Sequence, residues 1–541
     1  MMEPPRKQAK MVGWFDPPVL AQTAVHMATA NVFGRHSDSR LVEALASQPQ
    51  ACFDYPAADS DGLWLDYVAD IGDGWNATYA IAEALARPTL EVTTQAGGTV
   101  ASTRSGRVLV FGGDEVYPWP SRDAYAWRTE WPYRTAFEAH GTRPDLFAVP
   151  GNHDWFDSLV AFSRTFCRPE RGFAGCRTQQ TRSYFALKLP APWWLIAIDL
   201  QLGAELDEPQ VQYLRSVAAA MDPDAQVVLC VPEPQWLLEE SYPAHRAYGG
   251  GMLTTLEREI LERPVRAFVT GDWHHYRRHE NAAGVQKIVS GGGGAFLHPT
   301  HAPRTRDLKD GFVERAIYPD RATSRRLAWR NVKFPRLNPH SLVLPAVLYA
   351  LSAWFASASL GPADLASFGD TVAASFGAAL RDPVNGLWLL AVMAGFVFFT
   401  DTHERWYRII GGVSHAVVHL FAALVLAWLA ARFTTEWLGL EFGGIAQLLI
   451  AGALVFVCGG VVGGVLLGLY LLISVQVFGR HSNEAFSSLR IQDYKQWLRM
   501  HFAADGTLTI FAIGIDRVPR RTPDDPRATP PHLIEKVVLQ R

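Results

Sequence analysis

Residues 151–154 read Gly-Asn-His-Asp and place an amide oxygen, an imidazole and a carboxylate in a row directly after an apolar run. The run breaks at Pro150, and Pro and Gly are residues that end a strand and begin a turn. Polar ligands at a strand end suit metal-assisted phosphate chemistry. The same composition also occurs in ordinary turns, so the tetrapeptide alone does not establish a site.

Three other apolar runs end in glycine and acid. Residues 63–69 lead to Asp70, residues 107–112 lead to Asp114, and residues 265–270 lead to Asp272, which His274 follows. Open α/β sheets gather their functional residues at the carboxyl ends of strands. We therefore expect the side chains after these four strands to converge.

The elements that must position these side chains can be read from the alternation of apolar runs and helical patterns. Eight runs predict strands at 63–69, 107–112, 145–149, 184–189, 193–198, 225–231, 265–270 and 285–290. Helical patterns such as residues 75–85 lie between several of them. Strands interleaved with helices predict an α/β sandwich.

The order and spacing of these blocks resemble the calcineurin-like metallophosphoesterases over roughly residues 60–300. The family blocks D-x-H/G, G-D-x-x-D/Y, G-N-H-D/E and G-H-x-H correspond to residues 70–72, 113–117, 151–154 and 271–274. The resemblance implies a double-sheet α/β sandwich. Gly72 together with Tyr117 is similar to the purple-acid-phosphatase branch, in which the tyrosine is a ligand to iron.

The resemblance further implies a binuclear centre of two divalent or mixed-valence metal ions, drawn from Mn, Fe and Zn. Its implied metal ligands are Asp70, Asp114, Tyr117, Asn152, Glu233, Asp272 and His274. Asp114 would bridge the ions, and a hydroxide shared by them would attack phosphorus. His153 would protonate the leaving oxygen, and Asp154 would orient His153 or brace its loop.

Two of these positions depart from the family pattern. Glu233 stands after a strand where a lone His is expected, and Asp272 replaces the first His of G-H-x-H. If both acids bind, the second ion has a hard oxygen environment that favours Mn or Mg over Zn. If neither binds, the alternative is a catalytically weak fold that serves as a binding or regulatory module for its membrane domain.

Other residues near these blocks are open to two interpretations. His275 would be the ligand in place of His274 if the last block shifts by one residue. Glycines at 291–294 could bring backbone N–H groups close to an anion, or could form a flexible loop. His298 and His301 are candidates for substrate contacts, whereas Asp73 either approaches the site or caps a turn.

Beyond residue 340 the chain becomes apolar. Four spans can be drawn at about 341–360, 384–400, 411–432 and 445–477, near or above the ~20 residues that cross a bilayer. They predict a bundle of about four transmembrane helices, in which the glycine-containing fourth span tilts, bends or extends. In the third span, His415 and His419 suggest a proton path, a metal or a lipid phosphate, with snorkelling or an interhelical hydrogen bond as the alternative.

The charges between the spans predict an orientation. Lys and Arg concentrate in the lead-in at 321–336, in the connector at 401–408 and after residue 479, whereas the connectors 361–383 and 433–444 nearly lack them. The positive-inside rule then puts the catalytic domain and both termini in the cytoplasm, in an inner or plasma membrane. The absence of a signal-peptide pattern and five irregularly spaced cysteines agree with this expectation.

The 541 residues leave room for several domains, and the net charge of -3 gives no nucleic-acid signature. We predict an N-terminal helical segment at 1–49, a catalytic domain at 50–335, a transmembrane domain at 336–478 and a cytoplasmic segment at 479–541. The last would hold an amphipathic helix at 482–502, a strand at 508–515 and a loose tail at 518–530.

The combined expectation is a membrane-anchored, metal-dependent hydrolase of phosphoesters or phosphoanhydrides. Attachment to the membrane suggests a lipid-linked substrate, although no pocket residue identifies it. Transport by the spans, with the phosphoesterase as a gate, is a further alternative that four spans with few charges do not favour. The oligomeric state is not indicated.

Overall fold

The computed structural model describes residues 8–33, 52–57, 61–94, 97–98, 100–200, 206–241, 251–303, 305–358, 360–400, 404–520 and 525–541. It divides into two compact units, which are described separately. Unit 1 comprises Met1–Val12, Ala21–Ser324 and Arg490–Arg541, and unit 2 comprises Gly13–Leu20 and Arg325–Leu489. The boundaries predicted near residues 49, 335 and 478 stay predictions, because compactness does not test which segments fold independently.

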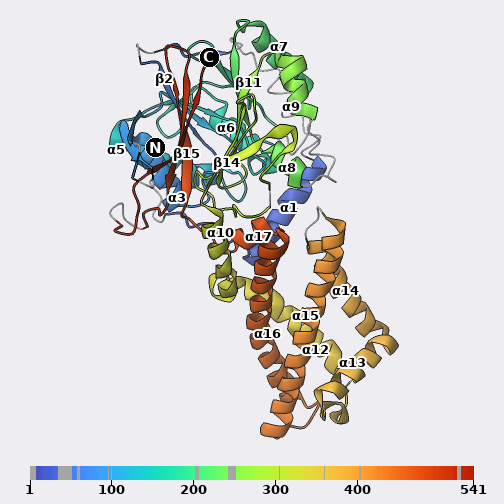
Figure 1. The fold of residues 1–541 in the computed structure, drawn as a ribbon. Helices are drawn as coiled ribbons and strands as arrows, with labels where there is room; N and C mark the ends of the chain where they lie inside the picture. The colour runs from blue at the N-terminus through green and yellow to red at the C-terminus, as the bar shows by residue number, and fades with distance from the viewer. Residues whose placement is uncertain are drawn as a thin grey trace. The chain divides into compact units, whose positions relative to one another are not determined.

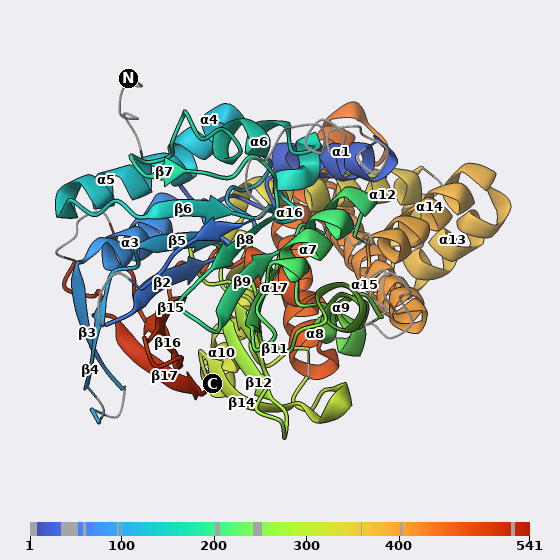
Figure 2. The same ribbon diagram turned by 90° about the horizontal axis from the view of Figure 1, so that it is seen from above.

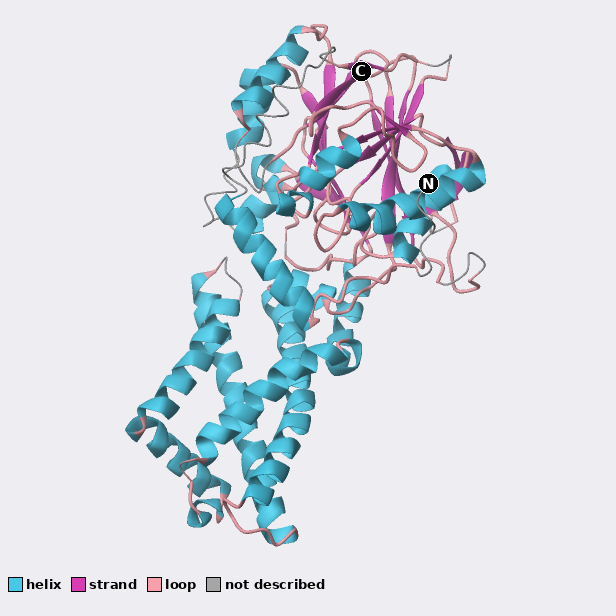
Figure 3. Ribbon diagram, turned by 180° about the vertical axis from the view of Figure 1, so that it is seen from behind, coloured by secondary structure: helices cyan, strands magenta, loops and turns pink. Residues whose placement is uncertain are grey.

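Unit 1 contains two large sheets, a mixed α/β arrangement that Figure 3 shows in magenta and cyan. The eight-stranded sheet runs β1 (Phe53–Asp54), β8 (Phe185–Lys188), β9 (Trp193–Ala197), β10 (Gln226–Val231), β11 (Val265–Thr270), β13 (Gln286–Ser290), β12 (Tyr276–Glu280), β14 (Val313–Tyr318). The seven-stranded sheet runs β17 (His532–Leu539), β16 (Leu508–Ile515), β15 (Lys495–Phe502), β2 (Leu63–Val68), β5 (Val108–Phe111), β6 (Asp145–Ala148), β7 (Arg177–Thr178). A separate hairpin joins β3 (Thr89–Thr93) and β4 (Val100–Arg104).

The two large sheets share one apolar core. Leu65 and Val110 of the seven-stranded sheet belong to the same buried cluster as Leu195 and Val228 of the eight-stranded sheet. Helices pack on the outer faces of both sheets (Figure 2). Helices α3 (Trp75–Ala86) and α5 (Trp131–His140) cover the seven-stranded sheet, and α7 (Glu208–Ala219) and α8 (Gln235–Ser241) cover the eight-stranded sheet. The predicted double-sheet α/β sandwich is therefore present in outline.

Shorter helices complete the connections of unit 1. They are α4 (Arg122–Tyr125), α6 (Val160–Phe166) and α9 (Gly251–Thr255). Helix α1 (Pro17–Phe33), which lies in the helical segment predicted at 1–49, and α10 (Arg321–Ala328) each cross a boundary between the units.

All eight predicted strands are present with ends shifted by at most one or two residues, and the strand at 508–515 is confirmed as β16. Strands β2, β5 and β6 are parallel neighbours, and so are β10 and β11 in the other sheet. Parallel neighbours end at the same sheet edge. The sequence misses the short strands β1, β3, β4 and β7 and the antiparallel strands β12, β14, β15 and β17.

The amphipathic helix expected at 482–502 is wrong beyond its first turns. Helix α17 ends at Ser487, and residues 495–502 form β15 between β2 and β16 (Figure 1). Nearly every residue of β15 is buried, because the strand is covered on both faces. In the sequence, the polar residues of this buried strand have the same pattern as the polar face of an amphipathic helix. A helix was therefore predicted where the fold has a strand.

A buried ion pair holds β15 to β2. Arg499 donates from Nε and Nη2 to the two carboxylate oxygens of Asp66 at 2.7 and 3.0 Å, and both side chains are almost fully enclosed. The tail predicted at 518–530 includes 521–524, which lie outside the described residues. After it, the chain returns to the sheet as β17.

Unit 2 is helical in its described residues. Its helices are α11 (Phe334–Leu337), α12 (Val343–Ser357), α13 (Phe368–Arg381), α14 (Pro383–Phe399), α15 (Arg405–Arg432), α16 (Ile445–Ile473) and α17 (Ser482–Ser487). Among the described residues, three helices are long and apolar enough to cross a membrane, at 339–357, 405–437 and 445–478. The α13–α14 pair, bent by 100°, would make a fourth span if it counts as one.

Close packing inside unit 2 depends on glycine and on buried polar groups. A Cβ at Gly463 of α16 would lie 2.4 Å from Pro345 Cβ, so only glycine allows this approach of α12. His419 Nδ1 lies 3.2 Å from the Tyr349 hydroxyl of α12, and His419 Nε2 lies 2.9 Å from His415 Nε2. The interhelical hydrogen bond that the sequence left as an alternative is therefore present.

Candidate metal centre

Five strand ends of unit 1 supply the candidate residues. Asp70 follows β2, Asp114 follows β5, and residues 152–154 follow β6, all from parallel neighbours of one sheet. From the facing sheet, Glu233 follows β10, and Asp272 with His274 follows β11. The convergence expected from the sequence therefore has a structural basis in two sheet edges.

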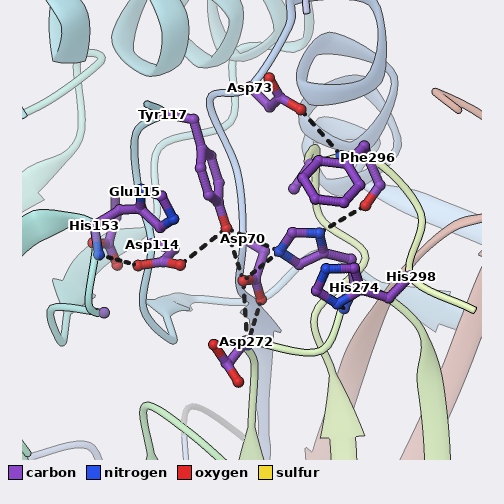
Figure 4. A network of polar contacts seen from close by, with 12 residues as sticks. Asp70, Asp73, Asp114, Glu115, Tyr117, His153, Asp272, His274, Phe296 and His298 are labelled. Atoms are coloured by element: carbon purple, nitrogen blue, oxygen red, sulfur yellow. Dashed lines mark hydrogen bonds and ion pairs between the residues drawn. The ribbon is translucent and has the colours of Figure 1, made fainter. Parts of the chain in front are cut away.

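The Tyr117 hydroxyl lies at the middle of the first group of side chains (Figure 4). Its oxygen is 3.0 Å from Asp70 Oδ1, 3.0 Å from Asp114 Oδ2 and 3.1 Å from His274 Nε2. His274 Nε2 is also 3.3 Å from Asp70 Oδ1. Residues separated by some two hundred positions along the chain thus meet at one buried point.

His274 enters this group in a defined tautomer. Its Nδ1 donates to the Phe296 carbonyl at 2.7 Å, which leaves the Nε2 lone pair facing Asp70 and Tyr117. Burial lowers the pKa of His274 well below its ordinary value, so the ring is neutral. A neutral imidazole whose second nitrogen is held by a carbonyl is typical of a metal ligand.

A second group of carboxylates surrounds Asp114. Burial and the charge of Asp70 raise the pKa of Asp114 to about 8. Burial, then Asp272 and Asp114, raise the pKa of Glu233 to about 8, and its Oε1 is enclosed without a hydrogen-bond partner. Burial, then Asp70 and Asp114, raise the pKa of Asp272 as well. These mutual effects show that the acids crowd one another in a poorly solvated space.

Backbone geometry marks the same three aspartates. Asp70, Asp114 and Asp272 have φ angles of 59°, 54° and 66°, in the left-handed region that residues with a Cβ rarely adopt. Asp272 also donates its backbone N–H to Asp70 Oδ2 at 2.9 Å. Strained conformations of this kind cluster at functional sites.

The donor set fits a bound cation. The first group offers two carboxyl groups, a phenol oxygen and a neutral imidazole nitrogen, and the Tyr117 oxygen lies 3.0 to 3.1 Å from an atom of each of the other three. Bonds of about 2.0–2.1 Å to one ion would bring neighbouring ligand atoms to about 3 Å from each other, as found here. Within the described residues, no three His, Cys, Asp or Glu side chains form a metal-holding group by themselves, so the Tyr117 oxygen is essential to this fit.

The structure does not bring every predicted residue into the cluster. The Asn152 side chain is exposed, and no hydrogen bond joins it to the described residues of the cluster. Asp154 is buried and accepts from the N–H groups of Gly151 at 2.9 Å and Glu115 at 3.3 Å. Asp154 therefore braces the loops after β5 and β6, which is one of the two roles expected for it.

His153 lies beside the first group. Its backbone N–H donates to Asp114 Oδ1 at 2.9 Å, and its Nδ1 donates to the Pro118 carbonyl at 2.7 Å. The ring centroid is 4.5 Å from that of Tyr117. Burial lowers the pKa of His153.

The open alternatives around His274 can now be compared. His275 is buried, its ring packs near Trp273, and it takes no part in the Tyr117 contacts, so the structure favours His274. His298 stacks on His274 with ring centroids 3.9 Å apart, and its Nδ1 accepts from the His274 N–H at 3.2 Å. His301 is buried and its Nδ1 lies 2.8 Å from Ser324 Oγ, so it contacts a different part of the unit.

The glycine segment 291–294 packs tightly against the ligand strand. Gly293 donates to the Ala69 carbonyl at 2.9 Å, and the following Ala295 donates to the Asp70 carbonyl at 2.8 Å. A Cβ at Gly291 would lie 2.6 Å from Asp70 Oδ2. The Gly293 N–H, which could have contacted an anion, is thus used together with the Ala295 N–H to hold residues 69 and 70.

No family model and no curated protein sequence matches the chain. Solved structures with partial likeness include a purple acid phosphatase, PPD1, from yellow lupin (Lupinus luteus) seeds, and PhoD. The first has 15% identity and a TM-score of 0.31 and covers 49% of this chain and 51% of that one. The second has 10% identity and a TM-score of 0.29 and covers 45% and 59%. This chain thus spans about half to three-fifths of their lengths, and the likeness carries no argument about activity.

Two neighbours of the site, Glu115 and Lys495, were missed by the sequence reading, whereas Asp73 was left with two interpretations. Asp73 bridges two segments, accepting from Val12 N–H at 2.8 Å and Phe296 N–H at 3.1 Å. Glu115 is fully buried behind Asp114, where burial and Asp154 raise its pKa. Lys495 is buried at the start of β15. The acid beside Asp114 was an available signal, whereas Lys495 was assigned to a helix.

Proposed function

We propose that the chain is a membrane-anchored, metal-dependent hydrolase of phosphoesters or phosphoanhydrides. The observation that carries the proposal is the meeting of Asp70, Asp114, Tyr117 and His274, which brings four potential metal ligands to one buried point. In water-poor surroundings such a group is stabilised by a cation. The acids that would bind metal ions, together with the neighbouring His153 as a proton donor, support hydrolysis of a phosphate bond.

Asp70, Tyr117, His274 and Asp114 would hold one ion. We assign Asp114, Asp272 and Glu233 to a second ion. Among the described residues these three carboxylates do not form a metal-holding group by themselves, so the carboxylates would have to move closer together and the Asn152 side chain would have to turn inward to join them. Bound divalent or mixed-valence ions, Mn, Fe or Zn, would activate water and neutralise phosphate charge. The unpartnered Glu233 Oε1 supports this assignment, because a buried oxygen without a hydrogen bond is costly unless a ligand occupies the space beside it.

His153 is assigned to the leaving group. The Pro118 carbonyl fixes its Nδ1 proton, so Nε2 is the nitrogen that exchanges a proton with a substrate oxygen. The contact from its N–H to Asp114 keeps the ring beside the metal-binding acids. Asp154 acts indirectly, because it fixes the loops that carry His153 and Asp114.

The apolar helices of unit 2 support membrane attachment. The Lys and Arg residues that flank the spans support a cytoplasmic catalytic unit and cytoplasmic termini. A membrane-attached hydrolase would encounter lipid-linked phosphate substrates, and we include these in the proposal. Labelling of single cysteines introduced in the connectors 361–383 and 433–444 tests the orientation. Reaction with an impermeant thiol reagent from the cytoplasmic side would contradict it.

The activity test uses the full-length chain purified in detergent. Metal content and hydrolysis of phosphomonoester and phosphodiester substrates are measured for the wild type, Asp114→Asn and Asp505→Asn, in which the exposed Asp505 is the control. We expect Asp114→Asn to lose bound metal and activity while the control keeps both. Less than one metal ion per wild-type chain without hydrolysis would refute the enzyme and favour the binding module.

The lipid arm of the proposal has its own comparison. The same preparation is assayed on a soluble phosphoester and on a lipid-linked phosphoester with the same reacting group. A higher kcat/KM for the lipid-linked compound is expected. Equal values would remove the lipid from the proposal without affecting the hydrolase.

A further inference from the structure

Lys495 is a buried cation at the edge of the metal centre. It is the first residue of β15, its side chain is fully enclosed, and its Nζ donates to the Ala295 carbonyl. Among the described residues, no carboxylate forms an ion pair with it. The charges of Asp73, Asp493 and Asp70 act on it, in that order of size, without forming an ion pair.

Such a placement is costly for folding. Moving an ammonium group out of water without a paired carboxylate costs free energy that one hydrogen bond to a carbonyl does not recover. The cost is reflected in the pKa of Lys495, which burial lowers to about 8. A methionine of similar length would fill the space without this penalty, so the ammonium calls for a functional explanation.

The segment that Lys495 holds reaches two of the four residues of the first group, Asp70 and His274. The Ala295 N–H donates to the Asp70 carbonyl at 2.8 Å, and the Ala295 carbonyl accepts from Lys495. The next carbonyl, that of Phe296, accepts from His274 Nδ1 at 2.7 Å. One peptide unit therefore separates the lysine contact from the bond that orients the imidazole.

A second contact joins the same two segments without a charge. Ser290 Oγ donates to Gln496 Oε1 at 2.6 Å, and the Gln496 N–H donates to the Gly292 carbonyl at 3.1 Å. These bonds fix the start of the glycine segment, whereas Lys495 fixes its end beside Phe296. The two contacts can therefore be separated by substitution.

We propose that Lys495 is a positioning residue of the metal centre, which holds the Ala295 carbonyl so that the adjoining Phe296 carbonyl keeps His274 Nε2 directed at Asp70 and Tyr117. This inference rests on the proposed function, since it assigns His274 to a metal ion. The lysine comes from residues 490–541, which follow unit 2 in the sequence. The metal centre thus depends on a segment that lies beyond the apolar helices along the chain.

The test measures metal affinity as well as activity. Full-length wild type, Lys495→Met, Lys495→Arg, Ser290→Ala and Lys536→Met are titrated with Mn²⁺ or Zn²⁺ in competition with a fluorescent chelator. Lys536 is an exposed control on β17. Loss of an outer contact of a metal ligand typically weakens binding about 10–100-fold, and we expect this range for Lys495→Met. Lys495→Arg should restore most of the affinity, Ser290→Ala should cause a smaller loss, and Lys536→Met should have no effect.

Unchanged metal binding by Lys495→Met would overturn the inference. Tighter binding would overturn it as well, because it would mean that the ammonium only repels the metal ion. Lys495→Gln, which keeps a neutral donor, is the second variant if the methionine does not fold, and the same outcomes decide. Wild type that binds metal but hydrolyses no phosphoester would refute the proposed function alone, since the dissociation constants still test Lys495. Wild type that binds no metal would overturn both.

Discussion

Replacing Glu233 by Gln should stabilise the metal-free protein and weaken its metal binding. The structure holds this carboxyl beside Asp272 and Asp114, and burial together with their charges raises its pKa from the ordinary 4.5 to about 8. Because the folded pKa lies above the unfolded one, folding takes up a proton between these values. The stability of the metal-free protein therefore falls as the pH rises from about 4.5 to about 8.

The magnitude follows from the same shift. At pH 7 the unfolded carboxyl is ionised and the folded one is mostly protonated, so keeping Glu233 in place costs about 2–3 kcal/mol, at about 1.4 kcal/mol per pKa unit with an allowance for partial exposure. Gln has the shape of the protonated acid and does not titrate. Glu233→Gln should remove this cost at pH 7 and change stability little at pH 4.5.

The assay is thermal unfolding of full-length wild type, Glu233→Gln and the exposed control Glu170→Gln in a chelator at pH 4.5, 6 and 7.5. The midpoint difference between Glu233→Gln and wild type should grow with pH to several degrees, while the control follows wild type. With metal added, the order should reverse because the variant lacks a ligand. A pH-independent difference, or a destabilised variant with unchanged metal affinity, would refute the reasoning.

Three further substitutions test other parts of the structure. Tyr117→Phe removes the central hydroxyl and should weaken metal binding at least about tenfold in the chelator competition, with the thermal midpoint of the metal-free protein little changed; unchanged affinity would contradict its role. Arg499→Met leaves Asp66 buried without its partner and should destabilise unit 1 by about 3–5 kcal/mol, whereas adding Asp66→Asn should recover much of the loss in thermal unfolding. Gly72→Ala should destabilise by more than about 1 kcal/mol, since φ is +77° and a Cβ would lie 2.4 Å from Thr129 Oγ1; an unaffected midpoint would contradict this.

The sequence predicted the strand ends well because the signal there is local. A buried parallel strand is a continuous apolar run, and the Gly-Asp pairs at its end are required by the turn itself. Gly113 with φ of 113° and Asp114 with φ of 54° show this requirement directly. The pairing of Gly72 with Tyr117 was also informative. A side chain at Gly72 would meet the Glu115 carbonyl at 2.5 Å, so a histidine ligand does not fit that position in this backbone.

The central strand β15 was not predictable in the same way. Lys495 and Arg499 are charged yet fully enclosed, and their partners, Ala295 and Asp66, lie about two hundred and four hundred positions earlier. A local pattern therefore shows polar residues where the fold has a core. The same limit applies to Glu233: its place after β10 was visible, but the enclosure of Oε1 without a hydrogen-bond partner is a property of the folded chain.

The costs of this fold are concentrated around one point. Three aspartates in the left-handed region cost about 1–2 kcal/mol each, and buried acids and a buried ammonium lie beside them. The three aspartates and the buried acids belong to neighbouring loops, and the buried ammonium of Lys495 holds the segment that is hydrogen-bonded to Asp70. A ligand that binds only the folded state offsets such costs, by about 4 kcal/mol when its concentration is a thousand times Kd. A cation is the ligand whose charge opposes the repulsion among the acids, and the metal-free protein should therefore be weakest at these loops.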